Sequence, residues 1–530
     1  MPLFHNEPLT DFSIESNRTA FKEAIRRVRA CLIQEIPLVI GANRPLPAPR
    51  LTRKNPSRLQ EILGRIGLSE PAHAERALDA AESAAAGWRN SPVSARTEIL
   101  QRAADLLRQR RFELAAWEVL EVGKPWIEAD ADVAEAIDTL VYYSQEMLRW
   151  TEQVSIGQVP GEHNLYPHEP LGPGVVISPW NFPLAILTGM TAAALVTGNT
   201  AILKPAEQSS IIAFHLVEIL LEAGVPPGVV NFLPGIGEEI GEYLVRSPRV
   251  HWIAFTGSKN VGLRIIRTAA EVPEEQHWVK RVIAEMGGKN AVIVDQDADL
   301  DEAVTGVAAS AFGYQGQKCS ACSRVIVLEP VADRFLDRLV ETARSLPIGP
   351  AEDPGTVIGP LVDDQAFERV LKTIEAGKRQ GHPVFQADVP QGMDGYFVGP
   401  TLFTQVKPES PLAQEEIFGP VLAVFSVKSF EEALSIANSV PYALTGGVYS
   451  RSPGRIEQAK REFHVGNLYI NRKITGAMVG RQPFGGLGLS GIGYKAGGPD
   501  YLLQFLQART ITENTLRHGF APPEEAAEVE

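Results

Sequence analysis

The spacing of apolar residues changes along the chain, and it predicts a mixed α/β protein. Between residues 71 and 150 the apolar positions recur with a helical period; Leu100, Ala103 and Leu107, for example, line one face of a helix. After residue 171, short apolar runs of strand length alternate with amphipathic stretches of helix length. This alternation is typical of parallel sheets whose connections are helices.

The apolar runs form two series, which predict two doubly wound α/β domains. The runs of the first series are 174–178, 200–203, 229–233, 252–255 and 281–284. Those of the second series are 291–294, 325–328, 423–425 and 466–470. We assign 1–150 and 171–286 to a Rossmann-like domain of the kind that binds dinucleotides, and 287–485 to a second, catalytic domain.

A β-hairpin is predicted between the helical region and the first sheet. Residues 154–159 and 164–166 have strand-like sequences, and Pro160 and Gly161 between them form a turn signal. Because no obvious partner lies nearby in the sequence, this hairpin is a candidate oligomerisation arm. An ordinary surface hairpin explains the pattern equally well.

The end of the chain is expected to contribute to the same arm. Alternation around residue 511 predicts an added strand, so we assign 151–170 and 486–515 to the oligomerisation arm. With such an arm the protein is expected to be a homo-oligomer, either a dimer or a dimer-based hexamer. The acidic tail 516–530 is expected to be disordered.

Composition and charge narrow the class of protein. At 530 residues, with 44% hydrophobic and 22% charged residues, we expect a soluble globular protein of two or three domains. A net charge of −14 argues against nucleic-acid binding, which requires a basic face. Three cysteines cannot build a disulfide framework, and the N-terminus lacks a signal-peptide pattern, so we predict a cytoplasmic protein.

One uncharged stretch, residues 170–203, has the length of a membrane span. Prolines interrupt it at Pro170, Pro173, Pro179 and Pro183. We therefore expect a buried strand–loop–helix–strand unit at this place and no association with a membrane.

Cys319 is the leading candidate for a reactive group. It lies with a second thiol, Cys322, in the polar segment 312–324, between a predicted helix and a predicted strand. Loops held between regular elements frequently carry reactive side chains. Taken alone, a cysteine is more often a small buried hydrophobic residue, so the loop by itself leaves both interpretations open.

The strand-to-helix connections of the first series offer a dinucleotide site. Thr256, Gly257 and Ser258 follow one strand and open a helix, where backbone amides can face a diphosphate, although a plain turn has the same composition. Lys204 and Glu207 follow another strand. A carboxylate there can accept from ribose hydroxyls and repel a 2′-phosphate, which favours NAD over NADP unless the pair only solvates a loop.

These features coincide with seven segments that resemble, in order, the signature segments of the aldehyde dehydrogenase superfamily. The segments are Pro179-Trp-Asn-Phe-Pro183, Lys204-Pro-Ala-Glu207, Phe255-Thr-Gly-Ser258, Glu285-Met-Gly-Gly-Lys289, Gly316-Gln-Lys-Cys319, Glu416-Ile-Phe-Gly-Pro420 and Pro483-Phe-Gly-Gly486. The resemblance covers nearly the whole chain. Seven segments in register make a chance match improbable.

The resemblance implies a catalytic trio of Cys319, Asn181 and Glu285. In this family the cysteine thiolate attacks an aldehyde to form a thiohemiacetal, and hydride transfer then leaves a thioester. By the resemblance, the Asn181 amide and the Cys319 N–H stabilise the oxyanion, and one such donor is typically worth about 3 kcal/mol. Glu285 activates the water that hydrolyses the thioester to a free acid.

The resemblance also implies NAD as the cofactor. By it, Glu416 holds the nicotinamide ribose and Phe418 flanks the nicotinamide ring. The other cofactor-binding residues that it implies are Ser178, Pro179, Trp180, Lys204, Glu207, Thr256, Gly257, Ser258 and Gly287.

Two segments, 313–320 and 463–477, are similar to the subgroup of this superfamily that oxidises L-glutamate γ-semialdehyde in proline catabolism. This small molecule carries an α-carboxylate, which requires hydrogen-bond donors at a fixed distance from the aldehyde. By the resemblance, the donors are the Ser320 hydroxyl and the backbone N–H groups of Gly476 and Ala477. Phe182 and Phe484 line the aliphatic chain of the substrate. Lys318 and Glu135 are possible additional polar contacts with the substrate tail, but we favour their interpretation as a solvated lysine and a helix-surface carboxylate.

Other functions stay open at this point. A dehydrogenase of another small semialdehyde would have the same chemistry, and a structural or binding protein could keep the fold without activity. Cys319 and Cys322 have the spacing of a redox dithiol, so thiol–disulfide exchange or an oxidative switch is a further alternative. Zinc would require more ligands, so we predict no metal site. A chain of this length leaves no room for a proline dehydrogenase domain, so that activity is expected on another polypeptide.

Overall fold

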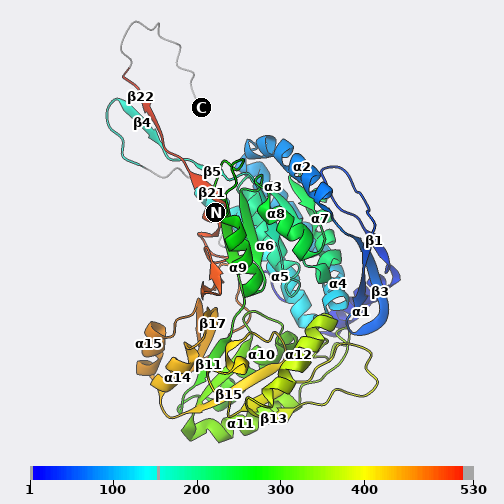
Figure 1. Ribbon diagram of the computed structural model, residues 1–530, viewed down its shortest axis with the longest axis vertical. Coiled ribbons are helices and arrows are strands. Elements are labelled where there is room, and N and C mark those ends of the chain that lie inside the picture. Colours follow the sequence, from blue (N-terminus) through cyan, green and yellow to red (C-terminus); the bar gives the residue numbers. More distant parts are fainter. Residues whose placement is uncertain (1–3, 152–155, 517–530) are drawn as a thin grey trace.

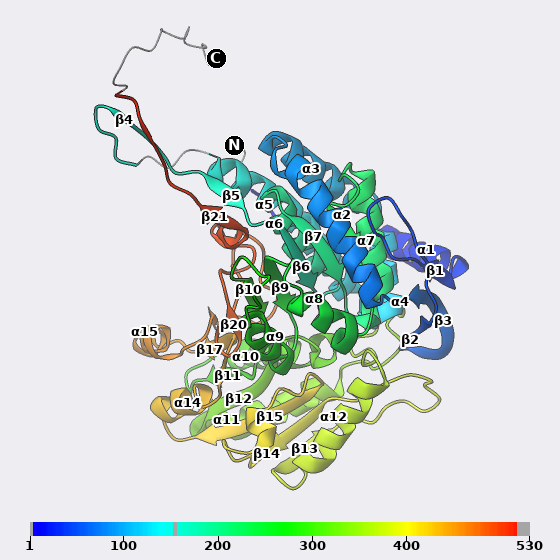
Figure 2. The same cartoon turned by 45° about the horizontal axis from the view of Figure 1, so that its top comes forward.

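The computed structural model describes residues 4–151 and 156–516, and two α/β sheets form its centre. Figures 1 and 2 show the sheet and helices of the first half of the chain above those of the second half, with a narrow two-stranded ribbon projecting away from both. The prediction of two doubly wound α/β units is confirmed.

The first sheet has the strand order β20-β10-β9-β6-β7-β8. Its strands are β6 (Pro173–Ile177), β7 (Thr200–Lys204), β8 (Val230–Phe232), β9 (Trp252–Thr256), β10 (Arg281–Glu285) and β20 (Gly491–Ile492). All are parallel except β20, which pairs antiparallel with β10. The chain winds from β6 toward both edges, which creates a switch point between β6 and β9 where α/β sheets bind ligands.

Helices cover both faces of this sheet. They are α2 (Pro71–Arg89), α3 (Val93–Gln109), α4 (Arg111–Val122), α5 (Trp126–Trp150), α6 (Ala185–Val196), α7 (Ser210–Glu222), α8 (Glu242–Arg246) and α9 (Lys259–Ala269). The predicted helical positions Leu100, Ala103 and Leu107 of α3 are buried in one core with side chains of α5, α6 and α7. Because both faces of the sheet are covered, its strands consist of continuous apolar runs.

The second sheet has the order β13-β14-β15-β12-β11-β17-β18. Its strands are β11 (Asn290–Val294), β12 (Cys322–Leu328), β13 (His382–Gln386), β14 (Thr401–Thr404), β15 (Val421–Val427), β17 (Thr445–Tyr449) and β18 (Asn467–Ile470). The accompanying helices are α10 (Leu300–Phe312), α11 (Glu329–Arg344), α12 (Asp364–Gly377), α13 (Pro411–Gln414), α14 (Phe430–Ala437) and α15 (Pro453–Glu462). Only β13 is antiparallel within this sheet.

A small N-terminal sheet was not predicted. After α1 (Glu15–Ala30), the strands β1 (Gln34–Ile36), β2 (Arg50–Asn55) and β3 (Arg58–Gly67) pair in the order β1-β3-β2. The exposed side of β2 carries charged residues, so its sequence has no apolar run, and pairing with β3 rather than an apolar pattern makes it a strand.

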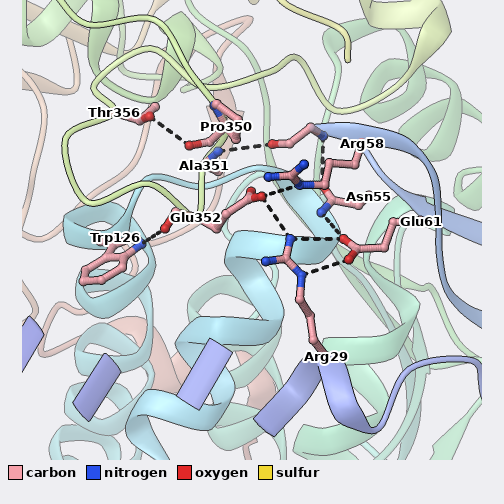
Figure 3. A network of polar contacts seen from close by, with 10 residues as sticks. Arg29, Asn55, Arg58, Glu61, Trp126, Pro350, Ala351, Glu352 and Thr356 are labelled. Atoms are coloured by element: carbon pink, nitrogen blue, oxygen red, sulfur yellow. Dashed lines mark hydrogen bonds and ion pairs between the residues drawn. The ribbon is translucent and has the colours of Figure 1, made fainter. Parts of the chain in front are cut away.

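Ion pairs join this small sheet to the second half of the chain (Figure 3). Arg29 of α1 contacts both Glu61 of β3, at 2.8 Å, and Glu352, at 2.9 Å. Arg58 contacts the same Glu352 carboxylate at 2.6 Å, and the Glu352 carbonyl accepts from Trp126 Nε1 at 3.1 Å. The network therefore ties the N-terminal sheet and α5 to the loop before α12.

The prediction that residues 154–159 pair with 164–166 as a hairpin is wrong. Residues 156–159 form no strand, and Val154 and Ser155 lie outside the described residues. Instead β4 (Glu162–Leu165) pairs with β22 (Ile511–Asn514) near the end of the chain. The expected C-terminal strand is confirmed, and it supplies the partner that the local sequence lacks. The proposed disorder of the tail concerns residues beyond 516, which lie outside the described part.

A second short pair continues this ribbon toward the body of the molecule. β5 (His168–Pro170) pairs antiparallel with β21 (Leu506–Ala508). The ribbon of β4 and β22 extends from this pair away from both sheets (Figure 1). A further short pair, β16 (Tyr442–Ala443) with β19 (Leu487–Gly488), lies near β20. The uncharged stretch before Lys204 folds as β6, α6 and β7. No helix within residues 4–151 and 156–516 is long and apolar enough to cross a membrane.

Candidate active site

The loop that carries Cys319 connects α10 to β12 and has an unusual backbone. Tyr314 and Gln315 have φ values of 50° and 56°, in the left-handed region that costs a non-glycine residue about 1–3 kcal/mol. Buried hydrogen bonds maintain this conformation: Tyr314 Oη donates to the Val122 carbonyl at 3.1 Å, and Gln315 Nε2 donates to the Pro360 carbonyl at 2.7 Å. The loop is therefore held by residues far from it in the sequence.

Asn290 fixes the backbone at the cysteine itself. Its Nδ2 donates to the carbonyl of Cys319 at 2.7 Å and to that of Ala321 at 2.9 Å. Its Oδ1 accepts from the backbone N–H of Thr445 at 3.0 Å. This side chain, at the start of β11, was missed in the sequence. The available signal was a polar residue directly after the Glu285–Lys289 motif and before a buried strand.

The surroundings of the half-buried Cys319 thiol disfavour its thiolate form. Burial, together with the nearby carboxylates of Glu416 and Glu285, raises its pKa to about 12, while backbone N–H groups of Cys319 and Ser320 oppose the shift. The thiolate fraction is thus even smaller than that of a free cysteine. The same electrostatic contacts place both carboxylates near the sulfur.

Asn181, the predicted oxyanion donor, contacts the loop that carries Cys319. It follows the carboxyl end of β6, is buried, and donates from Nδ2 to the carbonyl of Gln317, two residues before Cys319, at 3.0 Å. The amide of the first half of the chain therefore contacts the cysteine loop of the second half.

Glu285 ends β10 and is half-buried. Burial raises its pKa to about 8, against the opposing effects of the Gly486 N–H and the Lys495 charge. Gly486 donates to Glu285 Oε2 at 3.0 Å. A Cβ at Gly485 would lie only 2.8 Å from Oε1, so a glycine there leaves room for the carboxyl group. A carboxyl group with this pKa can exchange a proton near neutral pH.

Glu207 and Lys204 form one end of the predicted cofactor site. Lys204 ends β7, and its Nζ lies 2.9 Å from Glu207 Oε1. The same oxygen accepts from the Gly237 N–H at 2.7 Å. These two bonds orient the carboxylate and leave its second oxygen, Oε2, without a hydrogen bond within the described residues.

Glu416 and Phe418 form the other end of the predicted cofactor site. Gly288 N–H donates to Glu416 Oε1 at 3.1 Å, and burial raises the pKa of Glu416 to about 7. A Cβ at Gly287 would clash with this carboxylate at 2.0 Å, so the close approach requires glycine. Phe418 packs edge-on against Trp180, with ring centroids 5.4 Å apart.

Residues between these ends line the carboxyl edge of the first sheet. Ser178, which precedes Pro179, has a buried hydroxyl without a hydrogen-bond partner among the described residues. Ser258 caps α9, where the first backbone N–H groups of the helix are available to an anion. Thr256 ends β9, and the N–H of Gly257 donates to the Glu285 carbonyl at 3.0 Å. Two oriented carboxylates, a helix N-terminus and an unpartnered buried hydroxyl fit a dinucleotide.

The three groups predicted to donate hydrogen bonds to the substrate carboxylate are available for binding. Within the part of the chain that the structure describes, the backbone N–H groups of Gly476 and Ala477 and the Ser320 hydroxyl make no hydrogen bond. Gly476 has a φ of 75°, which favours glycine. Phe182 and Phe484 are half-buried.

The interpretation of Lys318 as solvated is wrong. The residue is buried, and its Nζ contacts Glu128 Oε1 at 2.6 Å. Glu135 is half-buried rather than a plain surface carboxylate, and burial raises its pKa to about 8. Sequence alone missed both because nothing in a helical or loop pattern reveals that a charged side chain faces the interior.

Cys322 has a place in the hydrophobic core. It begins β12, is almost fully buried among apolar side chains, and its thiol contacts the Arg324 carbonyl at 3.3 Å. All three cysteines are free. Within the described ranges no group of three metal-ligating side chains occurs. A packing role explains this thiol, and the oxidative switch stays a prediction.

Residues 47–511 match the family model described as "Aldehyde dehydrogenase family". The chain is also 48% identical over 510 residues to the 1-pyrroline-5-carboxylate dehydrogenase of Geobacillus thermodenitrificans (strain NG80-2), covering 96% of this chain and 99% of that protein. The relative of the same name from Geobacillus kaustophilus (strain HTA426) is 48% identical over the same length.

Two solved structures are similar over almost all of the chain. The 1-pyrroline-5-carboxylate dehydrogenase from Thermus with bound NAD has a TM-score of 0.95 at 49% identity, covering 97% of this chain and 99% of that one. Proline utilization A from Bdellovibrio bacteriovorus, inactivated by N-propargylglycine, has a TM-score of 0.96 at 52% identity. That comparison covers 98% of this chain and 54% of the larger protein, so the chain spans about half its length.

Proposed function

Because this chain belongs to the aldehyde dehydrogenase family, we propose that it oxidises L-glutamate γ-semialdehyde to L-glutamate with NAD, a step of proline catabolism. The observation that carries the proposal is the contact of Asn181, from the first half of the chain, with the Cys319 loop, beside the half-buried Glu285. The relatives named 1-pyrroline-5-carboxylate dehydrogenase support the substrate, since 1-pyrroline-5-carboxylate is in equilibrium with this semialdehyde.

Cys319 is the nucleophile in this proposal. The thiol first loses its proton to solvent; the thiolate sulfur then forms a bond to the aldehyde carbon, and the carbonyl oxygen becomes an oxyanion. The Asn181 amide and the Cys319 N–H stabilise that oxygen. The Asn290 clamp on the Cys319 carbonyl orients the N–H of this loop before the substrate arrives.

NAD, when bound, supplies the hydride acceptor. The Thermus relative with bound NAD supports this cofactor. Glu207 would accept hydrogen bonds from the adenosine ribose, Glu416 would accept them from the nicotinamide ribose, and Phe418 would lie beside the ring. Ser258 and the N-terminus of α9 would hold the diphosphate. The remaining contacts come from Ser178, Pro179, Trp180, Lys204, Thr256, Gly257 and Gly287.

Glu285 completes the cycle. Its carboxylate takes a proton from water, the resulting hydroxide attacks the thioester carbon, and the Cys319–acyl bond breaks to release a free acid. The pKa of about 8 suits this role, because the carboxylate can accept the proton at neutral pH and return it.

Ser320, Gly476 and Ala477 hold the substrate α-carboxylate. Their hydroxyl and N–H groups have no partner among the described residues, so binding a carboxylate satisfies three donors at once. Phe182 and Phe484 enclose the aliphatic chain between this carboxylate and the aldehyde.

The arm, the domain division and the compartment are parts of the same proposal. The ribbon of β4 and β22 extends from the body, and no further strand pairs with it among residues 4–151 and 156–516, which supports an oligomerisation arm and a dimer or dimer-based hexamer. Residues 1–150 with 171–286 form the NAD-binding domain, 287–485 the catalytic domain, and 151–170 with 486–515 the arm. Three free thiols support a reducing compartment such as the cytoplasm.

The proposed substrate is tested by a panel of aldehydes. We expect NADH formation with L-glutamate γ-semialdehyde to have a higher kcat/KM than with propanal, butanal or succinate semialdehyde. Propanal and butanal have no carboxylate for Ser320 and the 476–477 amides, and the carboxylate of succinate semialdehyde lies one carbon closer to its aldehyde. Ser320→Ala should reduce the ratio of kcat/KM between L-glutamate γ-semialdehyde and the other aldehydes. A wild-type protein that prefers propanal would contradict the proposed substrate and leave the aldehyde dehydrogenase chemistry intact.

Glu207 is expected to control the choice of cofactor. Its carboxylate repels a 2′-phosphate, so Glu207→Gln should raise the kcat/KM with NADP relative to NAD by about tenfold, equivalent to ~1.4 kcal/mol. Glu218→Gln, an exposed carboxylate on α7, serves as the matched control and should change neither value. An unchanged ratio in the Glu207 variant would exclude this residue as the discriminating group.

A further inference from the structure

The lysine directly after α4, Lys124, has no part in the mechanism above, yet it is completely buried. Its Nζ lies 3.4 Å from Glu118 Oε2 and 3.2 Å from Asp132 Oδ2. Neither contact has hydrogen-bond geometry, and Lys124 Nζ has no hydrogen-bond partner among the described residues. A buried ammonium group needs further stabilisation.

Two aromatic rings provide it. Lys124 Nζ lies 4.1 Å from the ring centroid of Phe182 and 5.4 Å from that of Tyr314. Both distances are within the range of cation–π attraction, which strengthens when water is excluded. Phe182 follows Asn181 directly, and Tyr314 belongs to the loop that carries Cys319. One ammonium group therefore contacts both catalytic loops.

The charge on Lys124 is secured by its neighbours. Burial lowers its pKa, but the charges of Asp132 and Glu118 outweigh burial and hold the pKa above its ordinary value. Burial and the adjacent Asp132 raise the pKa of Glu118 well above its ordinary range. The lysine thus stays an ammonium group at neutral pH.

Residues next to Lys124 also form hydrogen bonds with the same two loops. Asp132 Oδ2 accepts from the Leu184 N–H at 3.2 Å, which fixes the loop after Asn181. The Val122 carbonyl accepts from Tyr314 Oη at 3.1 Å. The end of α4 lies where the upper and lower halves of the molecule meet (Figures 1 and 2). This position suits a residue that aligns the two halves.

We propose that Lys124 is a positioning residue that sets the Asn181 loop against the Cys319 loop through the rings of Phe182 and Tyr314. The inference rests on the proposed function. Among the described residues, the contacts of Lys124 are with Glu118, Asp132, Phe182 and Tyr314, none of which is assigned to NAD. It therefore acts on the chemical step and on the placement of Phe182 against the substrate chain. Small displacements of such groups can cost about 10²-fold in rate.

Lys124→Met tests the proposal by kinetics. We expect kcat with L-glutamate γ-semialdehyde to fall by about 10- to 100-fold while the Kd for NAD stays unchanged, and Lys124→Arg to recover most of the loss. Lys280→Met is the matched control: Lys280 is also buried, but its Nζ donates to the Val245 carbonyl away from both loops. That variant should lose thermal stability and keep its kcat.

A double-mutant cycle with Phe182→Leu separates positioning from general destabilisation. If Lys124 acts through this ring, Lys124→Met should add little to the loss already caused by Phe182→Leu. Because Lys124→Met leaves carboxyl groups unpaired, Lys124→Met/Asp132→Asn is the second variant, with a balanced cluster. A kcat within twofold of wild type in either folded variant, or fully additive losses in the cycle, would overturn the proposal.

Alkylation of Cys319 by iodoacetamide gives a readout that needs no aldehyde turnover. Loosening the loop should raise its alkylation rate several-fold in Lys124→Met and leave it unchanged in Lys280→Met. If the wild type oxidises no semialdehyde but this difference is present, the proposed substrate fails and the positioning role survives. If the wild type turns over and the alkylation rates are equal, the positioning role fails alone.

Discussion

Cys319→Ser is expected to reduce NADH formation from L-glutamate γ-semialdehyde by about 10⁴-fold or more. A serine hydroxyl ionises far less readily than a thiol, and the loop offers no base within hydrogen-bonding distance of the side chain among the contacts described. The serine variant also cannot form the thioester on which the second half of the reaction depends. Steady-state NADH absorbance, with intact NAD binding as the folding check, measures the effect.

The matched control is Cys322→Ser in the same loop. This thiol is packed in the core at the start of β12, so we expect a modest loss of stability and a rate within a few fold of wild type. Thiol–disulfide exchange through both cysteines requires the opposite, namely loss of function in either variant. Equal rates of NADH formation in Cys319→Ser and wild type would exclude Cys319 as the nucleophile.

The regular elements around this cysteine were predictable because burial leaves a clear pattern. The strands β6, β7, β9 and β11 are covered on both faces, so each is a continuous apolar run. Helices such as α3 repeat their apolar residues at the helical period. In contrast, three of the six residues of β2 are charged, and β4 pairs with a strand near the far end of the chain. Their pairing is set by tertiary structure, which local pattern does not encode.

The sequence supplied candidate site residues, but it did not predict where they lie in the fold. The family resemblance named Cys319, Asn181 and Glu285, but the position of the cysteine differs from the usual rule for α/β sheets. Cys319 precedes β12 and therefore lies at the amino edge of its sheet, whereas Glu285 lies at the carboxyl edge of the other sheet. The two edges face each other, so each sheet supplies one part of the site.

Supporting residues were the hardest to predict. Lys124 follows a helix of ordinary composition, and Lys318 and Glu135 resemble solvated charges in the sequence. Their burial appears only when α4, α5 and the cysteine loop pack together. A charged residue inside such an interface is a sign of function that a linear pattern cannot supply.

Glu285→Gln is expected to separate the two halves of the reaction. The amide has the size of the carboxyl group and keeps an oxygen for the Gly486 N–H, but it cannot take a proton from water. Steady-state turnover should fall by about 10³-fold, while a burst of one NADH per active site persists. The acyl group should then remain on Cys319, where mass spectrometry of the quenched protein detects the thioester.

The pH dependence of the wild type gives an independent check. Burial raises the pKa of Glu285 to about 8, so its base form is scarce below that pH and predominates above it. Steady-state turnover should therefore rise as the pH increases through about 8, and the residual rate of Glu285→Gln should lack this rise. Turnover of the variant at the wild-type rate would exclude Glu285 as the base. A variant that forms no NADH at all would instead place this carboxylate in the attack on the aldehyde, because the step that fails would then precede the thioester.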